Sequence, residues 1–272
     1  MRIGLALGGG AARGIAHIGV LKYLEERNVK PCCIAGTSAG SIVGAFYCSG
    51  MPVEKIGRVI SEMSWRDLVR LSLPRKGVIK SSRLLKIVED HIGDLTFQEL
   101  KIPLLINAVD LLSGEEVVIS EGSVARAVMA SCAIPGIFTP VRLGNHLFVD
   151  GGLLDNVPVT LMVDRNIDYI IAVDVGAQKL LQKEPNTIFE VLIQSFDIVR
   201  RHRDMPAHKY ADKMIEPDLG EFAIWDTSKA EIMIRRGYEA AKVVLADVDL
   251  AKKQGRLAKW FSKRKQKMED SK

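Results

Sequence analysis

The sequence lacks any hydrophobic run long enough to cross a membrane as a helix. Of its 272 residues, 47% are hydrophobic, yet no stretch approaches the roughly 18 uninterrupted apolar residues that a bilayer requires. The apolar start, residues 1–7, meets three glycines at positions 8–10 before it reaches the length of a signal-peptide core. We therefore expect no transmembrane segment and no signal peptide, and we interpret residues 2–7 as a β-strand.

Cysteine and histidine are also scarce, which argues against a metal centre or a disulfide framework. The four cysteines and five histidines show neither zinc-ligand nor disulfide-scaffold spacing. No cluster of His, Cys and carboxylate residues has metal-ligand spacing, so the sequence predicts no metal and no cofactor. The cysteines are interpreted as small core residues of a chain in a reducing, cytoplasmic compartment: Cys32, Cys33, Cys48 and Cys132.

Positive charge is concentrated at the end of the chain. Residues 251–272 contain nine Lys or Arg and two acidic residues, a net charge of +7, whereas the whole chain has a formal charge of +5. The body, residues 1–250, is therefore slightly acidic, and its charge argues against a nucleic-acid partner.

Within this basic tail, Trp260 and Phe261 stand among lysines and arginines. Basic residues around an aromatic pair are typical of a helix that lies on an anionic bilayer. The hypothesis is peripheral contact with the inner membrane surface through the tail. The alternative is a solvated terminus whose two aromatic side chains dock on the body.

Two strand-loop-helix units open the chain and predict its fold class. Residues 2–7 and 32–35 are short apolar runs, and each ends in glycine before a helical pattern begins. Such units build a mostly parallel sheet with helices on both faces, a three-layer α/β/α fold. No repeat or low-complexity linker precedes the tail, so we expect one domain over residues 1–250 and a separate tail over 251–272.

The remaining chain alternates further strand and helix patterns. Helical patterns occupy most of 53–100, then 121–132 and 187–203, and a long one over 227–267 is interrupted at Gly237 and Gly255. Strand patterns are predicted at residues 104–109 and 116–119, which form a hairpin, at 137–141, at 147–150 and at 168–175.

The second strand-to-helix turn has the pattern of a nucleophile elbow. Gly36 and Gly40 flank Ser38 in a G-x-S-x-G sequence, and small residues at these places permit a strained turn that exposes the serine hydroxyl. The following helix points its N-terminal amides toward the same space. Ser38 is therefore a candidate nucleophile.

The first turn, Gly8-Gly9-Gly10-Ala11-Ala12-Arg13-Gly14, is rich in small residues. Its backbone N–H groups can point into one space and stabilise an oxyanion. The alternative is a nucleotide-phosphate loop, but a dinucleotide site requires an acidic residue at the end of the second strand, and that strand ends in Gly36-Thr37-Ser38. The sequence also lacks a GK[ST] signature of a P-loop.

A serine nucleophile needs a proton acceptor, and Asp150 offers one. It ends an apolar strand and is followed by Gly151 and Gly152, which permit close approach to another loop. The resulting pair, Ser38 and Asp150, is the candidate catalytic centre.

Four separated blocks of the sequence, in order and spacing, resemble the bacterial patatin-like phospholipases. They are L-G-G-G-A-A-R-G at 7–14 with A-H-I-G-V-L at 16–21, G-T-S-A-G-S at 36–41, S-C-A-I-P-G-I-F at 131–138 and V-D-G-G at 149–152. The resemblance covers about residues 1–215. It implies a patatin-like α/β/α fold that hydrolyses fatty-acyl esters of phospholipids or related lipids through an acyl-enzyme.

The resemblance also implies specific roles. Ser38 would be the nucleophile and Asp150 the general base of a Ser-Asp dyad. The oxyanion hole would consist of backbone N–H groups of the glycine loop: Gly9, Gly10, Ala11 and Arg13. The sequence departs from the family pattern at Ala11, which stands where a central glycine is expected. Alanine would be strained there if the position requires a positive φ.

Two other functions remain open from the sequence. A poor oxyanion loop would leave a non-catalytic lipid-binding or regulatory protein on the same fold. A triad esterase would need His202 or His208 beside the serine, but His202 lies in a basic run that is typical of a solvated helix face.

Overall fold

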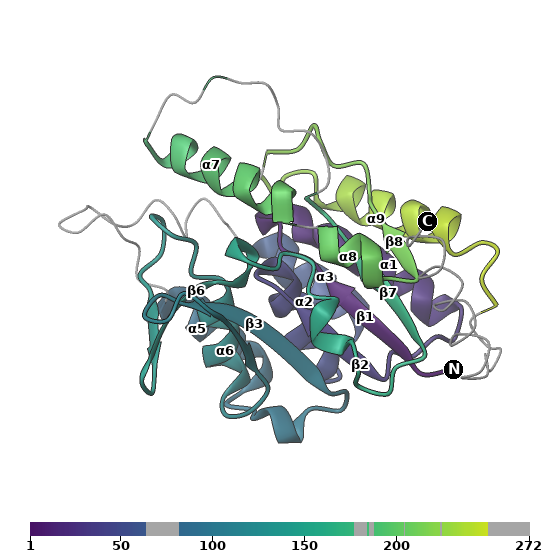
Figure 1. Cartoon of the computed structure of the whole chain (residues 1–272). Helices are drawn as coiled ribbons and strands as arrows, with labels where there is room; N and C mark the ends of the chain where they lie inside the picture. Colours follow the sequence, from purple (N-terminus) through teal and green to yellow (C-terminus); the bar gives the residue numbers. More distant parts are fainter. Residues whose placement is uncertain (64–81, 177–183, 185–187, 204, 224, 250–272) are drawn as a thin grey trace, which may run out of the picture.

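The computed structural model describes residues 1–63, 82–176, 184, 188–203, 205–223 and 225–249 (Figure 1). The basic tail and part of the predicted helical region, residues 64–81, lie outside the described residues. Within the described ranges, no helix combines the length and the hydrophobicity needed to cross a bilayer.

The centre of the protein is one eight-stranded sheet with the order β5-β6-β3-β2-β1-β7-β8, and β4 pairs with β3 beside this path. The parallel pairs are β1–β2, β1–β7, β2–β3 and β7–β8, whereas β3–β4, β3–β6 and β5–β6 are antiparallel. The strands are β1 (Ile3–Leu7), β2 (Cys33–Gly36), β3 (Leu104–Asp110), β4 (Glu116–Ile119), β5 (Val141–Leu143), β6 (His146–Asp150), β7 (Tyr169–Val173) and β8 (Lys213–Ile215).

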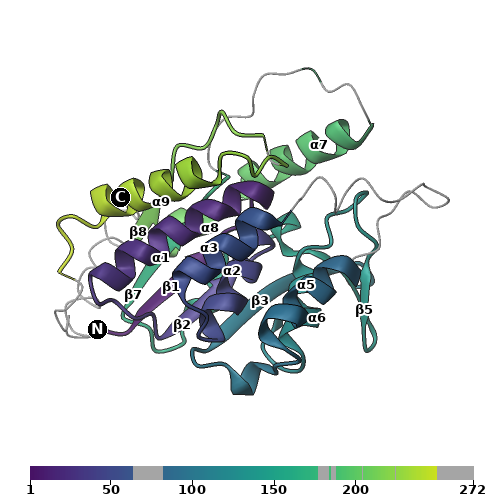
Figure 2. The same ribbon diagram turned by 180° about the vertical axis from the view of Figure 1, so that it is seen from behind.

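The α-helices are α1 (Ala16–Glu26), α2 (Ala39–Cys48), α3 (Val53–Glu62), α5 (Ser82–Ile92), α6 (Val124–Ser131), α7 (Ile188–Arg203), α8 (Met205–Tyr210) and α9 (Ala230–Val244). Single-turn helices are η1 (Ala11–Ile15), η2 (Phe97–Glu99), η3 (Gly151–Leu153) and η4 (Thr160–Met162). Figure 2 shows α1, α3 and α9 on the near side of the sheet.

The two faces of the sheet bury different side chains because residues alternate along each strand. Leu5 and Leu7 of β1 join the larger core with α1, α2, α3, α6 and α9. Ala6 between them joins a smaller core with the segment around η4 and with α8. The mostly parallel sheet between two helical layers confirms the predicted three-layer α/β/α class.

The local patterns predicted most elements. The two strand-loop-helix units, the β3–β4 hairpin, β7 and α7 are confirmed. Of the predicted extended stretch 137–141, only Val141 enters a strand.

The predicted interruption at Gly237 is wrong, because α9 runs through this residue without a break. A side chain at position 237 would overlap the backbone of Ala16, and one at Gly19 would overlap the backbone of α9 at Ile234. Gly237 therefore permits close packing of α9 on α1 and does not end the helix. Gly255 lies outside the described residues.

Candidate active site

Ser38 stands at the sharp turn between β2 and α2. Its backbone has φ 49° and ψ −121°, a conformation that L-residues rarely adopt and that the surroundings must hold. A Cβ atom on Gly40 would collide with the carbonyl of Leu7, and one on Gly36 would lie 2.8 Å from the Gly40 oxygen. Both predicted elbow glycines are thus required by close backbone approach.

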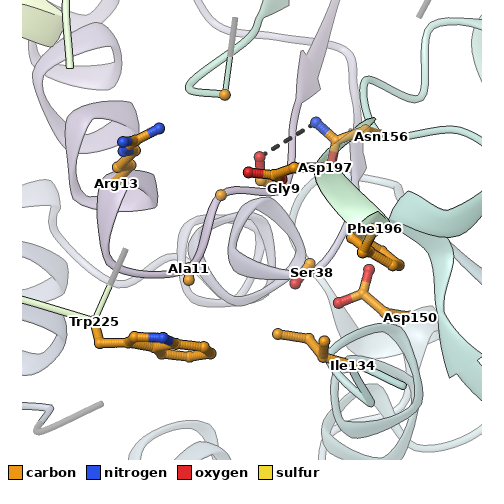
Figure 3. Close-up of a pocket in the computed structure, with 12 residues that line it drawn as sticks. Gly9, Ala11, Arg13, Ser38, Ile134, Asp150, Asn156, Phe196, Asp197 and Trp225 are labelled. Carbon is orange, nitrogen blue, oxygen red and sulfur yellow. Dashed lines mark hydrogen bonds between the residues drawn. The ribbon is translucent and has the colours of Figure 1, made fainter. Parts of the chain in front are cut away.

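Asp150, at the end of β6, contacts this serine. The Ser38 side chain is close enough to the Asp150 carboxylate to lower its pKa, and the Gly152 N–H donates a hydrogen bond to Oδ1 at 2.8 Å. Figure 3 shows the carboxylate directed toward Ser38. The structure therefore brings together the two residues that the sequence paired.

Burial alters the acidity of this carboxyl. Asp150 is 2% exposed, and burial raises its pKa to about 6, although the neighbouring Ser38 side chain and the Gly152 N–H act in the opposite direction. Removal from water disfavours the ionised form. A carboxylate with a pKa near 6 is a better proton acceptor than an exposed aspartate and is still ionised at neutral pH.

The last residue of α6 and the residues that follow it contact both members of this pair. The backbone N–H of Ser38 donates to the Ser131 hydroxyl oxygen at 2.8 Å. Two residues later, the Ala133 carbonyl oxygen accepts a hydrogen bond from the Asp150 N–H at 3.0 Å. Residues 131–133 therefore fix the position of the Ser38 turn relative to Asp150.

The glycine loop lines the same pocket, but its amides are not equivalent. The Gly9 N–H donates to the Asn156 carbonyl oxygen at 3.1 Å, and the Arg13 N–H donates to the Gly10 carbonyl oxygen at 3.1 Å. The N–H groups of Gly10 and Ala11 make no hydrogen bond within the described part of the chain. Of the four residues predicted for the oxyanion hole, only Gly10 and Ala11 therefore have backbone N–H groups that no other described residue accepts.

Ala11 has a φ of +48°. The position therefore does require a positive φ, which strains an alanine. A left-handed alanine costs roughly 1 kcal/mol relative to glycine. The residue is nevertheless 9% exposed and begins η1, so its amide is one of the unpaired N–H groups at a helix start.

The side chain of Arg13 holds a distant segment against the loop. Its Nε and Nη2 atoms donate to the Phe222 carbonyl oxygen at 3.0 and 2.8 Å, and the residue is 5% exposed. Trp225, three residues further on, lines the pocket beside Ala11 (Figure 3). The Arg13 side chain therefore positions the segment that carries Trp225 in the pocket wall.

The pocket next to the Ser38–Asp150 pair is small and opens to solvent. Its cavity volume is about 60 Å³. Its apolar wall comes from three segments of the chain and consists of Ile134, Phe196 and Trp225.

Histidine does not line this pocket in the described part of the chain. His208 is exposed and lies 3.8 Å from Glu216, and the side chain of His202 is outside the described residues. His17 is buried, as expected for local packing, and its Nε2 donates to the Gly8 carbonyl oxygen at 2.8 Å. Burial lowers the pKa of His17 to about 4, so it stays neutral beneath the loop.

Comparison with known proteins identifies the family. A family model described as patatin-like phospholipase matches residues 5–163. The chain belongs to the patatin-like phospholipase family. The resemblance inferred from the four sequence blocks is thereby confirmed.

Relatives of this patatin-like chain include enzymes and uncharacterised proteins. An uncharacterized NTE family protein of Mycobacterium bovis is 35% identical over 197 residues, which cover 70% of this chain and 54% of the relative. A lysophospholipase of Saccharomyces cerevisiae is 31% identical over 246 residues, 88% of this chain and 14% of the yeast protein. The chain thus spans about half the length of the mycobacterial relative.

A solved structure also shares the patatin-like fold. VipD from Legionella pneumophila matches with a TM-score of 0.63 at 16% sequence identity, over 90% of this chain and 66% of VipD. At this identity the likeness concerns the fold alone.

Sequence reasoning missed the polar residues that join the loops of this patatin-like site. Thr37 Oγ1 donates to Asn107 Oδ1 at 2.7 Å, and Asn107 Nδ2 donates to the Asp155 carbonyl oxygen and to Glu116. Asn156 Nδ2 donates to the Gly9 carbonyl oxygen at 3.3 Å. Ser131 and Thr37 lie in sequence blocks that resemble the family, but neither had an assigned role, and Asn107, Asp155, Glu116 and Asn156 stand in no motif.

Within the described residues, no three His, Cys, Asp or Glu side chains gather as a metal site requires.

Proposed function

We propose that this patatin-like protein is a serine acyl hydrolase that cleaves fatty-acyl esters of phospholipids or related lipids. The observation that carries the proposal is that Ser38 and the buried Asp150 carboxylate face each other (Figure 3) inside a pocket with an apolar wall. The relative from yeast that bears the name lysophospholipase supports the lipid class of substrate. We assign the activity to residues 1–250.

In the first half of the reaction, Asp150 accepts the proton of Ser38 while Oγ attacks the ester carbonyl carbon. The negative charge that develops on the carbonyl oxygen is stabilised by the N–H groups of Gly10 and Ala11. When the intermediate collapses, protonated Asp150 gives its proton to the departing alcohol. An acyl-enzyme on Ser38 remains.

In the second half, water replaces the alcohol and Asp150 accepts a proton from it as it attacks the acyl carbon. Collapse of this second intermediate releases the fatty acid and returns the proton to Ser38. The same carboxyl thus serves as base and then as acid in each half, which fits a pKa of about 6.

Substitution of the serine tests the proposal. Wild type and Ser38→Ala are compared on p-nitrophenyl esters of short and long fatty acids, with circular dichroism to check folding. We expect Ser38→Ala to lose at least about 10³-fold in kcat/KM. Ser49→Ala, which removes a hydroxyl bonded to Phe46 at the end of α2, serves as the matched control and should retain activity. Turnover by Ser38→Ala within a few-fold of wild type would refute the proposal.

The positive φ of Ala11 gives some support to a second function, a non-catalytic lipid-binding protein on the same fold. This alternative expects a folded wild-type chain that retains fatty-acyl ligands but hydrolyses no ester above the rate of Ser38→Ala.

A further inference from the structure

Asn156 holds Gly9, the residue just before the two proposed oxyanion donors, at two points. The backbone carbonyl oxygen of Asn156 accepts the Gly9 N–H at 3.1 Å. The side-chain Nδ2 of Asn156 donates to the Gly9 carbonyl oxygen at 3.3 Å. Asn156 is 3% exposed and lines the same pocket as Ser38. One buried residue therefore bonds both polar backbone groups of Gly9.

Close approach requires a glycine at position 9, and this glycine needs such support. A Cβ atom here would lie 2.6 Å from Asn156 Oδ1 and 3.1 Å from Ser38 Cβ, so a larger residue does not fit. Glycine, however, leaves the backbone free to rotate. The Gly9–Gly10 peptide group can then turn about the Gly9 Cα, which would change the direction of the Gly10 N–H. Hydrogen bonds to the peptide group oppose this rotation.

The two peptide groups on either side of Gly9 are held by different partners. The Gly8 carbonyl oxygen accepts from Nε2 of the buried His17 at 2.8 Å, and the N–H of the same peptide group donates to the Asn156 carbonyl oxygen. The carbonyl oxygen of the next peptide group, Gly9–Gly10, accepts from the Asn156 side chain. The side-chain amide of Asn156 therefore sets the orientation of the second group.

The geometry of a peptide group turns a hold on its carbonyl into control of its N–H. The Gly9–Gly10 peptide is trans, and in a trans peptide the C=O and N–H point in opposite directions. The Gly10 N–H therefore points away from the Asn156 amide. In Figure 3 the bond from Asn156 to Gly9 leaves the loop on the side away from Ser38. The Gly10 N–H is thus directed to the side on which an oxyanion forms at Ser38.

Neighbouring contacts keep Asn156 itself in place. Thr37 Oγ1 and Asn107 Nδ2 donate to the carbonyl oxygen of the preceding residue, Asp155, at 3.1 and 2.8 Å. A Cβ atom on Gly152 would lie 2.9 Å from Asn156 Oδ1, so the amide packs closely on the turn after β6. The segment that follows β6 therefore supports the glycine loop as well as the carboxylate.

We propose that Asn156 is a positioning residue that keeps the Gly10 N–H directed at the oxyanion. The Asn156 amide holds the Gly9 carbonyl before substrate arrives, so the donor needs no reorientation when charge develops on the ester oxygen. In this role Asn156 moves no proton and forms no covalent bond. The proposal rests on the proposed function for its reaction, whereas the hold on the Gly9–Gly10 peptide belongs to the free protein.

Steady-state kinetics of Asn156→Ala test the role first. This variant keeps the backbone carbonyl that accepts the Gly9 N–H and removes Nδ2. We expect kcat for p-nitrophenyl butyrate to fall about 10- to 100-fold while KM stays within about threefold, because the lost interaction acts in the transition state. Asn145→Ala is the matched control, since Asn145 is exposed in the turn between β5 and β6, and it should keep both constants. Circular dichroism checks folding.

An alkyl trifluoromethyl ketone then separates positioning from a general loss of structure. Ser38 Oγ adds to the ketone carbon, its proton passes to Asp150, and the ketone oxygen becomes the anion that the loop stabilises. The inhibition constant of Asn156→Ala should rise by about the same factor as kcat/KM falls. The pH midpoint of kcat/KM should stay at the wild-type value, because Asp150 is not altered.

Two results in an active protein would overturn the proposal. One is a kcat and a ketone inhibition constant of Asn156→Ala that equal those of wild type. The other is a shifted pH midpoint with an unchanged inhibition constant, which would show that Asn156 acts on Asp150. If Asn156→Ala does not fold, the same measurements are made on Asn156→Ser, whose shorter side chain does not reach the Gly9 carbonyl.

Failure of the proposed function is recognised separately. If wild type neither hydrolyses an ester nor binds the ketone, the acyl hydrolase proposal fails, and crystal structures of wild type and Asn156→Ala test the hold on the loop. A rotated Gly9–Gly10 peptide in the variant supports the positioning role of Asn156. An unchanged peptide would overturn it.

Discussion

The hydroxyl oxygen of Ser131 accepts a hydrogen bond from the backbone N–H of Ser38 at 2.8 Å, across 93 positions of sequence. Both residues are buried, so the Ser131 hydroxyl supplies the acceptor that this N–H needs inside the protein. The bond fixes the orientation of a peptide group whose residue has an unusual backbone conformation. Because the Ser38 N–H already donates to Ser131, it does not serve as a donor to the oxyanion.

Substitution Ser131→Ala should therefore lower catalysis through the position of the nucleophile. A buried N–H without an acceptor costs about 1–3 kcal/mol, and the turn can relax away from Asp150. We expect kcat to fall roughly 10- to 100-fold with little change in KM. Steady-state kinetics on a soluble ester and urea unfolding check the result.

Two further variants separate positioning from simple loss of stability. Ser131→Thr keeps the hydroxyl and should recover part of kcat. Ser49→Ala removes a hydroxyl elsewhere on the neighbouring helix and should leave kcat unchanged. Equal kcat for Ser131→Ala and wild type would show that the bond serves folding alone.

The pH dependence of catalysis should report the ionisation of Asp150. The carboxyl accepts a proton only when ionised, and burial raises its pKa to about 6. We expect kcat/KM for a neutral ester to rise about tenfold per pH unit below pH 6 and to level off near pH 7. His17, with a pKa of about 4, titrates below this range. A profile that is flat from about pH 5 to pH 7 would contradict the role of Asp150 as base.

Substitution Asp150→Asn should remove both activity and a pH-dependent cost in stability. The folded pKa of about 6 lies above the ordinary aspartate value of 3.8, so the folded chain binds more protons than the unfolded chain between these pH values. Ionisation of Asp150 therefore destabilises the wild type as pH rises from about 4 to about 6, by an amount on the order of 3 kcal/mol.

Asparagine cannot ionise, so the variant escapes this loss. We expect its free energy of unfolding, relative to wild type, to increase between about pH 4 and pH 7, while hydrolysis falls about 10²- to 10⁴-fold. Urea denaturation at both pH values measures the difference. The same stability difference at both pH values would argue that burial does not disfavour the charged form.

Substitution Ala11→Gly tests whether the departure from the glycine pattern harms the site. Glycine adopts the φ of +48° without strain but loses more entropy on folding, so we expect a stability change between zero and a gain of about 1 kcal/mol. The amide is already oriented, and kcat/KM should change less than about threefold.

Ala12→Gly is the matched control for this substitution, because Ala12 is the buried next residue without a positive φ. It should destabilise by about 1 kcal/mol. A rise of kcat/KM beyond about tenfold in Ala11→Gly would show that alanine leaves the oxyanion hole poorly formed.

The elements that the sequence predicted are those with local signals. Glycines around Ser38 and at positions 8–10 marked two tight turns, and Ser113-Gly114 between two apolar runs marked the hairpin of β3 and β4. Gly237 misled because its local preference against a helix was outweighed by the contact of α9 with α1. Intrinsic propensity is weak compared with such packing.

The supporting residues of the site could not be predicted in the same way. Ser131 reaches Ser38 across 93 positions, and Asn156 reaches Gly9 across 147. Neither residue type is unusual, and the contact exists only after the strands have paired. Periodicity likewise predicted α7 but could not tell that part of its apolar surface faces outward.

The most direct test of the account is covalent labelling with a fluorophosphonate probe, followed by peptide mass spectrometry. The probe reacts with a serine only when a base and oxyanion donors activate its hydroxyl. We predict a single phosphonylated residue, Ser38, in wild type, and loss of labelling in Asp150→Asn. An unlabelled but folded wild-type protein, or labelling that persists in Asp150→Asn, would contradict a Ser38–Asp150 catalytic pair.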